Sequence, residues 1–255
     1  MLRGELVKSG MEFVSTFGPA FIINLPERAD RRREFSHQLS RIGLQFDNEN
    51  INLFRADRPT EAGGFPSIGA KGCFNSHLQI IRRASTEGCD QILVCEDDLD
   101  FSPDFLDRMP EVIKAANSCK WDIIYFGHHG LPVHTITSSS GILLRVDPEQ
   151  EIGATHFIAF RKSVFGRIRR YLEDLTSRPA GHPDGGPMHI DGAFSRFRAD
   201  NPDVATYAVM PPIGFQRPSR TDIHELKWYD RSVAIRGFTA MARRMRRWIV
   251  ARRSL

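Results

Sequence analysis

The sequence of 255 residues predicts an α/β protein in which a mixed sheet is flanked by helices. Apolar runs that suit buried strands occur at 20–25, 91–95 and 121–126. Segments with the 3.6-residue periodicity of helices lie between them, at 27–42 and 72–87. Strands that alternate with helices in this way are typical of a sheet covered by helices, and a chain of this length can bury a substantial core.

The charge of the chain is unevenly distributed. The net charge is +4, but the segment 231–255 contains eight arginines and no acid. Residues 1–230 therefore carry −4, the difference between +4 and +8. A nucleic-acid enzyme is expected to place its basic patch around its active centre. Because the acids here gather at the end of a strand, we expect no nucleic-acid partner.

The cysteines and the hydropathy favour a cytoplasmic protein. The four cysteines form no CxxC pair, which argues against a zinc module and for reduced thiols. No apolar run approaches the roughly 20 residues that span a bilayer. The N-terminal stretch also lacks the pattern of a signal peptide. We divide the chain into an extension at 1–19, one domain at 20–230 and a basic tail at 231–255.

A strand-to-helix junction follows the first apolar run, because Pro26 ends the strand and helical periodicity then begins. Asn24, Arg28 and Arg32 lie at this junction, which is a common place for the phosphates of a nucleotide. The alternative is that these arginines are solvated or paired with Asp30.

A second helix is expected from about Gly72 to Glu87. Ser76 and His77 lie in its first half, but neighbouring helical residues point about 100° apart and so do not form a nucleophilic dyad. His77 is either a structural histidine or a residue that contacts a ligand.

An acidic cluster ends the apolar run 91–95. Glu96, Asp97 and Asp98 follow it directly, and Asp100 comes two residues later. The end of a buried strand is where α/β sheets commonly bind ligands. Carboxylates held there repel one another unless a cation lies among them, so we expect a divalent metal site. The alternative is an acidic loop or helix entrance, and Asp100 is interpreted as a helix-entry acid.

The remaining elements are shorter. Further strands are expected at 51–56, 141–146, 156–160 and 205–210, and further helices at 103–117, with Ser102 as its cap, and at 162–175. His128 and His129 lie between two glycines and are candidates for a substrate loop. The segment 177–187 is rich in proline and glycine and predicts a mobile loop.

Asp191 begins another short helix and is a candidate catalytic base, provided that the fold brings it to the acidic cluster. The alternative is that it only caps the helix. Polar residues that could contact a ligand follow the last strand: Gln216, Arg217, Ser219, Arg220, Asp222 and His224.

The tail predicts a basic amphipathic helix. Apolar residues recur at spacings of three and four: Phe238, Met241, Ala242, Met245, Trp248 and Ile249. Arginines fill positions between them, which is typical of a helix that lies on an anionic membrane surface. The alternative is a helix that docks on the body of the protein.

Several stretches together resemble glycosyltransferase family 25, the lipopolysaccharide glycosyltransferases related to the collagen galactosyltransferases. The stretches are 21–32, 69–77 and 92–98, followed by Gln216 with Ser219, Asp222 and Ile223. They spread over residues 20–224 in the order of the family. Each is weak alone, and together they indicate the family without indicating donor or acceptor.

The resemblance implies a GT-A-like fold over 20–230 and inverting transfer from a nucleotide sugar, with Mn²⁺ or Mg²⁺ as cofactor. Glu96, Asp97 and Asp98 resemble the metal motif of the family. Asp98 would be the main metal ligand, and Glu96 or Asp97 would contact the ribose or the metal through water. Asp191 would be the catalytic base, although its match to the motif is loose.

The other implied contacts concern the donor. The nucleotide of the donor would lie near Asn24, Arg28 and Arg32. Residues of the second motif and of the C-terminal loop would also contact the donor: Gly72, Ser76, His77 and Gln216. His224 would be a further contact to the metal or the diphosphate.

The leading hypothesis is a glycosyltransferase that moves a hexose, galactose or glucose, from a UDP donor to a lipopolysaccharide core or another cell-surface glycan. The tail would hold it on the cytoplasmic face of the inner membrane, near a lipid-linked acceptor. A metal-dependent nucleotidyltransferase or phosphohydrolase could use the same acidic cluster. A catalytically silent, membrane-associated binding module is the third hypothesis.

We expect the 255-residue chain to sediment with anionic liposomes and the triple variant Phe238→Ser, Met245→Ser, Trp248→Ser to stay in the supernatant. The substitutions remove the apolar side of the expected tail helix and leave its arginines, each worth about 1 kcal/mol near anionic headgroups. Unchanged sedimentation of the variant would contradict membrane binding by the tail.

Overall fold

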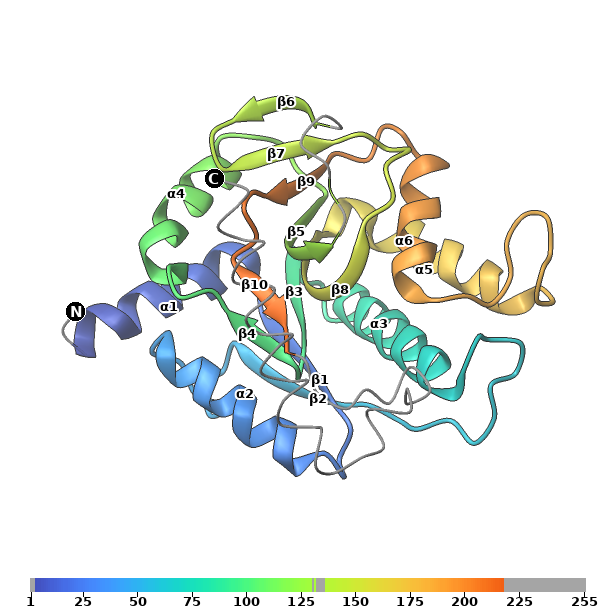
Figure 1. Cartoon of the computed structure of the whole chain (residues 1–255), viewed down its shortest axis with the longest axis horizontal. Helices are drawn as coiled ribbons and strands as arrows, with labels where there is room; N and C mark the ends of the chain where they lie inside the picture. The colour runs from blue at the N-terminus through green and yellow to red at the C-terminus, as the bar shows by residue number, and fades with distance from the viewer. Residues whose placement is uncertain (1–2, 130, 132–135, 218–255) are drawn as a thin grey trace, which may run out of the picture.

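The computed structural model describes residues 3–129, 131 and 136–217 (Figure 1). The tail 231–255 and its expected amphipathic helix lie outside the described residues, as do Ser219, Arg220, Asp222 and His224. Within the described part, no helix is both long enough and apolar enough to cross a membrane.

The centre of the molecule is an eight-stranded mixed sheet with the order β2-β1-β3-β8-β5-β9-β7-β6. Its strands are β1 Ala20–Asn24, β2 Ile51–Arg55, β3 Gln91–Glu96, β5 Ile123–His129, β6 Ile136–Ser140, β7 Leu143–Val146, β8 Gly153–Arg161 and β9 Thr206–Val209. β1 is parallel to both β2 and β3, and β5 is parallel to β9, whereas β8 runs antiparallel between β3 and β5. A second sheet pairs β4 Leu99–Phe101 with β10 Gly214–Gln216.

Helices cover both faces of the large sheet (Figure 1). They are α1 Arg3–Phe17, α2 Ala29–Arg41, α3 Ile68–Thr86, α4 Phe105–Asn117, α5 Lys162–Ser177 and α6 Ile190–Ala199. Successive side chains of a strand point to opposite faces. On β3, Leu93 belongs to the core under α1, α2 and α4, and Val94 belongs to the core under α3, α5 and α6. The mixed α/β sheet flanked by helices that the sequence predicts is confirmed.

Helix α1 is packed into the first of these cores. Phe13 and Phe17 are buried, and their ring centroids lie 5.4 and 4.8 Å from that of Phe126 on β5. Gly10 allows α1 to approach the end of α2 closely, because a Cβ at position 10 would lie 2.1 Å from the carbonyl oxygen of Ile42.

Three expectations for the local structure are wrong. Asp100 is not a helix-entry acid, because it lies in β4, which pairs with a strand more than a hundred residues later. Ser102 does not cap α4, which begins at Phe105. Neither His128 nor His129 lies in a loop, because both end strand β5.

The start of α3 also differs from the expectation. The helix begins at Ile68, four residues before Gly72. Its N-cap is Ser67, whose hydroxyl accepts a hydrogen bond of 3.0 Å from the backbone N–H of Ala70. Glycine and proline in the preceding segment hid this first turn from the periodicity.

We expect Phe13→Ala to lower the free energy of unfolding by about 3–5 kcal/mol, the usual cost of removing a buried phenylalanine ring. Val7→Ala on the same helix is the matched control, because Val7 is 43% exposed, and it should change stability little. Urea unfolding followed by circular dichroism measures both variants. Equal stabilities would show that α1 is not part of the core.

Candidate functional site

The site begins where β1 and β3 end side by side. The two strands are parallel, and their register sets Ile23 opposite Glu96. Asn24, the last residue of β1, therefore lies beside Asp97, the residue that directly follows β3. The amide nitrogen of Asn24 donates hydrogen bonds to Asp97 Oδ2 at 2.7 Å and to the carbonyl oxygen of Arg28 at 3.2 Å. The sequence-predicted junction and the acidic cluster are thus one place.

Arg31 is the basic residue that reaches the acidic cluster. It lies in the first turn of α2, and its Nη1 is 2.9 Å from Asp97 Oδ1 and 3.5 Å from Asp98 Oδ2. All three side chains are nearly buried, with 11% of Arg31 and 7% of each aspartate exposed. Sequence reasoning missed Arg31 and selected its neighbours instead.

The two arginines that the sequence reasoning selected are placed differently. Arg28 is paired with Asp30, with its Nη2 2.9 Å from Oδ2, as the alternative interpretation expected. Arg32 Nη1 lies 3.5 Å from the side-chain oxygen of Asn24. Both remain at the rim of the junction, and their contact with a donor stays a prediction.

Glu96 is a buried acid of the cluster that pairs with β8. Its Oε1 accepts a hydrogen bond of 2.9 Å from Thr155 Oγ1, which the antiparallel pairing of β3 with β8 brings alongside. Burial, together with the negative charge of Asp98, raises the pKa of Glu96 to about 8.

Asp98 is held from two sides but keeps one free oxygen. Burial raises its pKa to about 6, against the lowering effect of the nearby charge of Arg31. Gln216 on β10 donates a hydrogen bond of 3.3 Å to Asp98 Oδ2. Asp98 Oδ1 is buried and has no hydrogen-bond partner among the residues that the structure describes.

These carboxylates fit a divalent cation that binds together with a substrate. Mg²⁺ and Mn²⁺ take hard oxygen ligands, and Mg²⁺ is usually held by one or two carboxylates plus phosphate oxygens and water. Asp97 and Asp98 supply such carboxylates, and Oδ1 of Asp98 is buried without a hydrogen-bond partner among the described residues. In the described ranges no three His, Cys, Asp or Glu side chains converge to hold a metal by themselves.

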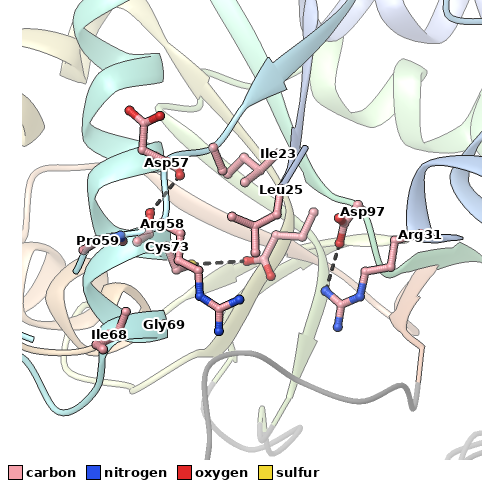
Figure 2. Close-up of a pocket in the computed structure, with 14 residues that line it drawn as sticks. Ile23, Leu25, Arg31, Asp57, Arg58, Pro59, Ile68, Gly69, Cys73 and Asp97 are labelled. Atoms are coloured by element: carbon pink, nitrogen blue, oxygen red, sulfur yellow. Dashed lines mark hydrogen bonds and ion pairs between the residues drawn. The ribbon is translucent and has the colours of Figure 1, made fainter. Parts of the chain in front are cut away.

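A first cavity opens between the ends of β1 and β3, the loop after β2 and helix α3 (Figure 2). Its walls combine apolar side chains, acids and two arginines: Ile23, Leu25, Pro59, Arg31, Arg58 and Asp97. Gly72 lets the loop approach α3, because a Cβ there would lie 3.2 Å from Pro59 Cδ. Ser76 also lines this cavity, and its hydroxyl donates a hydrogen bond of 2.8 Å to the carbonyl oxygen of Gly72.

A second cavity adjoins the first, and Cys73 and Glu96 line both. Its polar lining comes from five elements and the turn before α6: Glu96, His129, Thr155, His189, Asp191 and Gln216. The fold therefore brings Asp191 to the acidic cluster. His129 was a candidate only as a loop residue, and sequence reasoning missed both His189 and Thr155.

Asp191 is not the cap of α6, because the cap position belongs to His189. Its Oδ1 accepts a hydrogen bond of 2.9 Å from the backbone N–H of Gly192, and its Oδ2 accepts one of 3.4 Å from that of Ala154. Ala154 has a φ of 72°, a conformation that costs a non-glycine residue free energy and often marks a functional site. Two backbone amides thus orient the carboxylate.

Neither His77 nor Asp100 belongs to the lining of either cavity. His77 is fully buried, with its Nδ1 3.0 Å from the carbonyl oxygen of Cys73 and its ring edge-on to Phe194, and burial lowers its pKa. This geometry corresponds to the structural interpretation of His77. Asp100 accepts a hydrogen bond of 2.7 Å from Arg217 Nη2 and one of 2.9 Å from Gln38.

Arg217 fastens strand β10 beside the cluster. Besides Asp100 it pairs with Glu34 on α2, and its backbone N–H donates to the carbonyl oxygen of Asp98 at 2.6 Å. This anchoring holds the neighbouring Gln216 against Asp98. His224, the predicted metal or diphosphate contact of this segment, lies outside the described residues.

We expect stability to depend on pH through His128. Burial lowers its pKa to about 4 from the usual 6.5, and its Nε2 lies 3.2 Å from the carbonyl oxygen of Val209. The unfolded chain therefore binds the proton more readily, so stability is complete above about pH 6.5 and falls as pH drops toward 4. At pH 5 this effect lowers the free energy of unfolding by about 2 kcal/mol.

The variant His128→Gln should lack this component of the pH dependence, whereas His37→Gln, at an exposed histidine, should retain it. Urea unfolding at pH 7.5 and pH 5 measures the difference. An unchanged pH dependence in His128→Gln would contradict the lowered pKa.

Comparison with known proteins gives a consistent set of relatives. Residues 17–138 match the model of glycosyltransferase family 25, described as an LPS biosynthesis protein. A glycosyltransferase 25 family member of Drosophila pseudoobscura pseudoobscura is 32% identical over 146 residues, which are 49% of this chain and 23% of that protein. Procollagen galactosyltransferase 1-B of Xenopus laevis is 29% identical over 136 residues, 46% of this chain and 22% of that protein.

A third relative carries a different description. The human protein named inactive glycosyltransferase 25 family member 3 is 25% identical over 144 residues, 49% of this chain and 24% of that protein. The chain spans about a quarter of the length of the curated relatives it matches. The matches confirm, over residues 17–138, the resemblance to glycosyltransferase family 25 that the sequence motifs predicted.

Proposed function

We propose that the protein is an inverting, metal-dependent glycosyltransferase that moves a hexose from a nucleotide sugar to a glycan. The observation that carries this proposal is the junction of the two cavities. Glu96 lines both, Asp97 lines the first and Asp191 the second. A donor and an acceptor bound in adjoining cavities would meet at the carboxylates that the reaction needs.

The first cavity suits the nucleotide part of the donor. Ile23, Leu25 and Pro59 offer an apolar wall for a base, and Arg31 and Arg58 lie where they can face a diphosphate (Figure 2). Guanidinium groups pair well with phosphate oxygens because their donors are planar and forked. The relatives named procollagen galactosyltransferases support UDP-galactose as the first donor to test, with UDP-glucose as the second.

Asp97 and Asp98 would hold the Mn²⁺ or Mg²⁺ ion. A divalent cation at this place would neutralise the charge that develops on the leaving diphosphate. The protein's own contribution is to keep both carboxylates at the end of β3, with Asn24 and Arg31 orienting Asp97 and Gln216 orienting Asp98.

Asp191 is proposed as the general base. It would take the proton of the acceptor hydroxyl while that oxygen attacks the anomeric carbon from the face opposite the diphosphate. The new carbon–oxygen bond forms as the bond to the phosphate oxygen breaks, which inverts the anomeric centre. The hydrogen bonds from Gly192 and Ala154 support this role because they orient the carboxylate without protonating it.

The lining of the second cavity supports a neutral sugar. Its described residues include two acids and two histidines but neither lysine nor arginine, so an anionic sugar would find no fixed positive charge there. The acceptor is proposed to be a lipopolysaccharide core or another cell-surface glycan, which the description of the matching family supports. The basic tail would place the enzyme on the cytoplasmic face of the inner membrane.

A donor screen tests this proposal. UDP or GDP release is measured for UDP-galactose, UDP-glucose and GDP-mannose, with a lipopolysaccharide core acceptor, in Mn²⁺ and in EDTA. We expect UDP release that depends on acceptor and stops in EDTA. Asp98→Ala should abolish it, and Asp191→Asn should lower kcat by about 10²–10⁴-fold with little change in the donor KM.

Asp47→Asn is the control, because this acid is exposed and remote from both cavities. Release of sugar phosphate in place of transfer would favour the phosphohydrolase or nucleotidyltransferase hypothesis. Donor binding without turnover, for every acceptor tried, would favour the silent binding module, as the name of the human relative would suggest.

A further inference from the structure

The acidic cluster already has a cation of its own, the guanidinium of Arg31. We propose that Arg31 is a stored counter-ion: it neutralises Asp97 and Asp98 while the donor is absent and passes to the phosphates of the donor when a divalent cation takes its place. This inference rests on the proposed function, since the donor and the cation are those proposed above.

The first support is the way Arg31 bridges the two carboxylates. Its Nη1, which comes from helix α2, lies 2.9 Å from Asp97 and 3.5 Å from Asp98, the two residues that directly follow β3. Buried like charges are costly unless an opposite charge lies between them. Asn24 and Gln216 donate hydrogen bonds to the pair, but Arg31 is the cation whose side chain contacts both carboxylates.

The second support is that Arg31 leaves the neutralisation incomplete. Both oxygens of Asp97 are satisfied, one by Asn24 and one by Arg31. Asp98 Oδ1, in a side chain that is almost wholly buried, has no partner among the described residues. A buried acceptor without a partner costs about 1–3 kcal/mol, and a divalent cation would satisfy it where a single guanidinium does not.

The third support is the position of Arg31 at the edge of the first cavity. Figure 2 shows its side chain directed from α2 toward Asp97, with Arg58 projecting from the loop on the other side of the cavity. A long side chain in this place can exchange a carboxylate for a phosphate by changing its rotamer, with α2 unmoved. Arg58 and Arg31 would then hold the diphosphate from two sides.

Competition follows from the charges. A guanidinium and a divalent cation repel each other, so each lowers the affinity of the Asp97–Asp98 pair for the other. Arg31 therefore weakens the binding of the cation until phosphates offer it another partner. By linkage, the donor and the cation then strengthen each other's binding.

Titration calorimetry of the 255-residue chain tests the proposal with two probes, MnCl₂ alone and UDP in saturating MnCl₂. We expect Arg31→Gln to bind MnCl₂ alone about tenfold more tightly than the wild type, because the competing charge is gone. The same variant should bind UDP about tenfold more weakly, because a phosphate contact is lost.

Two further variants serve as controls. Arg33→Gln removes the same charge from an exposed position on the same helix and should match the wild type with both probes. Arg31→Lys keeps a positive charge but loses the fork, so MnCl₂ should bind nearly as in the wild type while UDP binds more weakly. Circular dichroism establishes that each variant is folded.

The outcomes separate this inference from the proposed function. Equal or weaker MnCl₂ binding by folded Arg31→Gln, in a protein that binds MnCl₂ and UDP, overturns the stored counter-ion alone. If Arg31→Gln does not fold, Arg31→Lys with unchanged UDP affinity overturns it. A wild type that binds neither probe overturns the proposed donor and cation, and this inference with them.

Discussion

The parallel pairing of β1 with β3 is the constraint on which the site depends. Because both strands end at the same edge, Asn24 meets Asp97, and the first turn of α2 places Arg31 beside the acids. β8 then runs antiparallel to β3, which sets Thr155 next to Glu96. The contacts of Asn24 and Thr155 with the cluster follow from where β3 stops and which strands lie on its two sides, whereas Gln216 reaches Asp98 from β10 in the second sheet.

Much of this could be predicted from the sequence, because the signals were local. An apolar run that ends in Glu96-Asp97-Asp98 indicates a buried strand with acids at its edge, and Asn24 ends the strand beside it. The parts that could not be predicted depend on distant pairing. From the sequence, Asp100 is interpreted as a helix-entry acid. It lies instead in a three-residue strand, which forms by pairing with β10 more than a hundred residues later.

Arg31 shows a different limit. Residues 31–33 are three arginines in a row, and the sequence does not distinguish them. Only the direction of α2 relative to β3 decides that the first reaches the acids, the second the amide of Asn24, and the third remains exposed. Asp191 was found from its residue type, but its place in the second cavity depends on the packing of α6 beside β8.

The two cavities are built from different parts of the chain. The described lining of the first comes entirely from residues 23–97, whereas the second also draws on β5, β8, α6 and β10. The segment that matches the family model, 17–138, therefore contains the whole wall of the first cavity and only part of the second. In evolutionary terms, such a division allows one half of a binding site to be inherited unchanged. The other half, and with it the specificity for the second substrate, can then diversify.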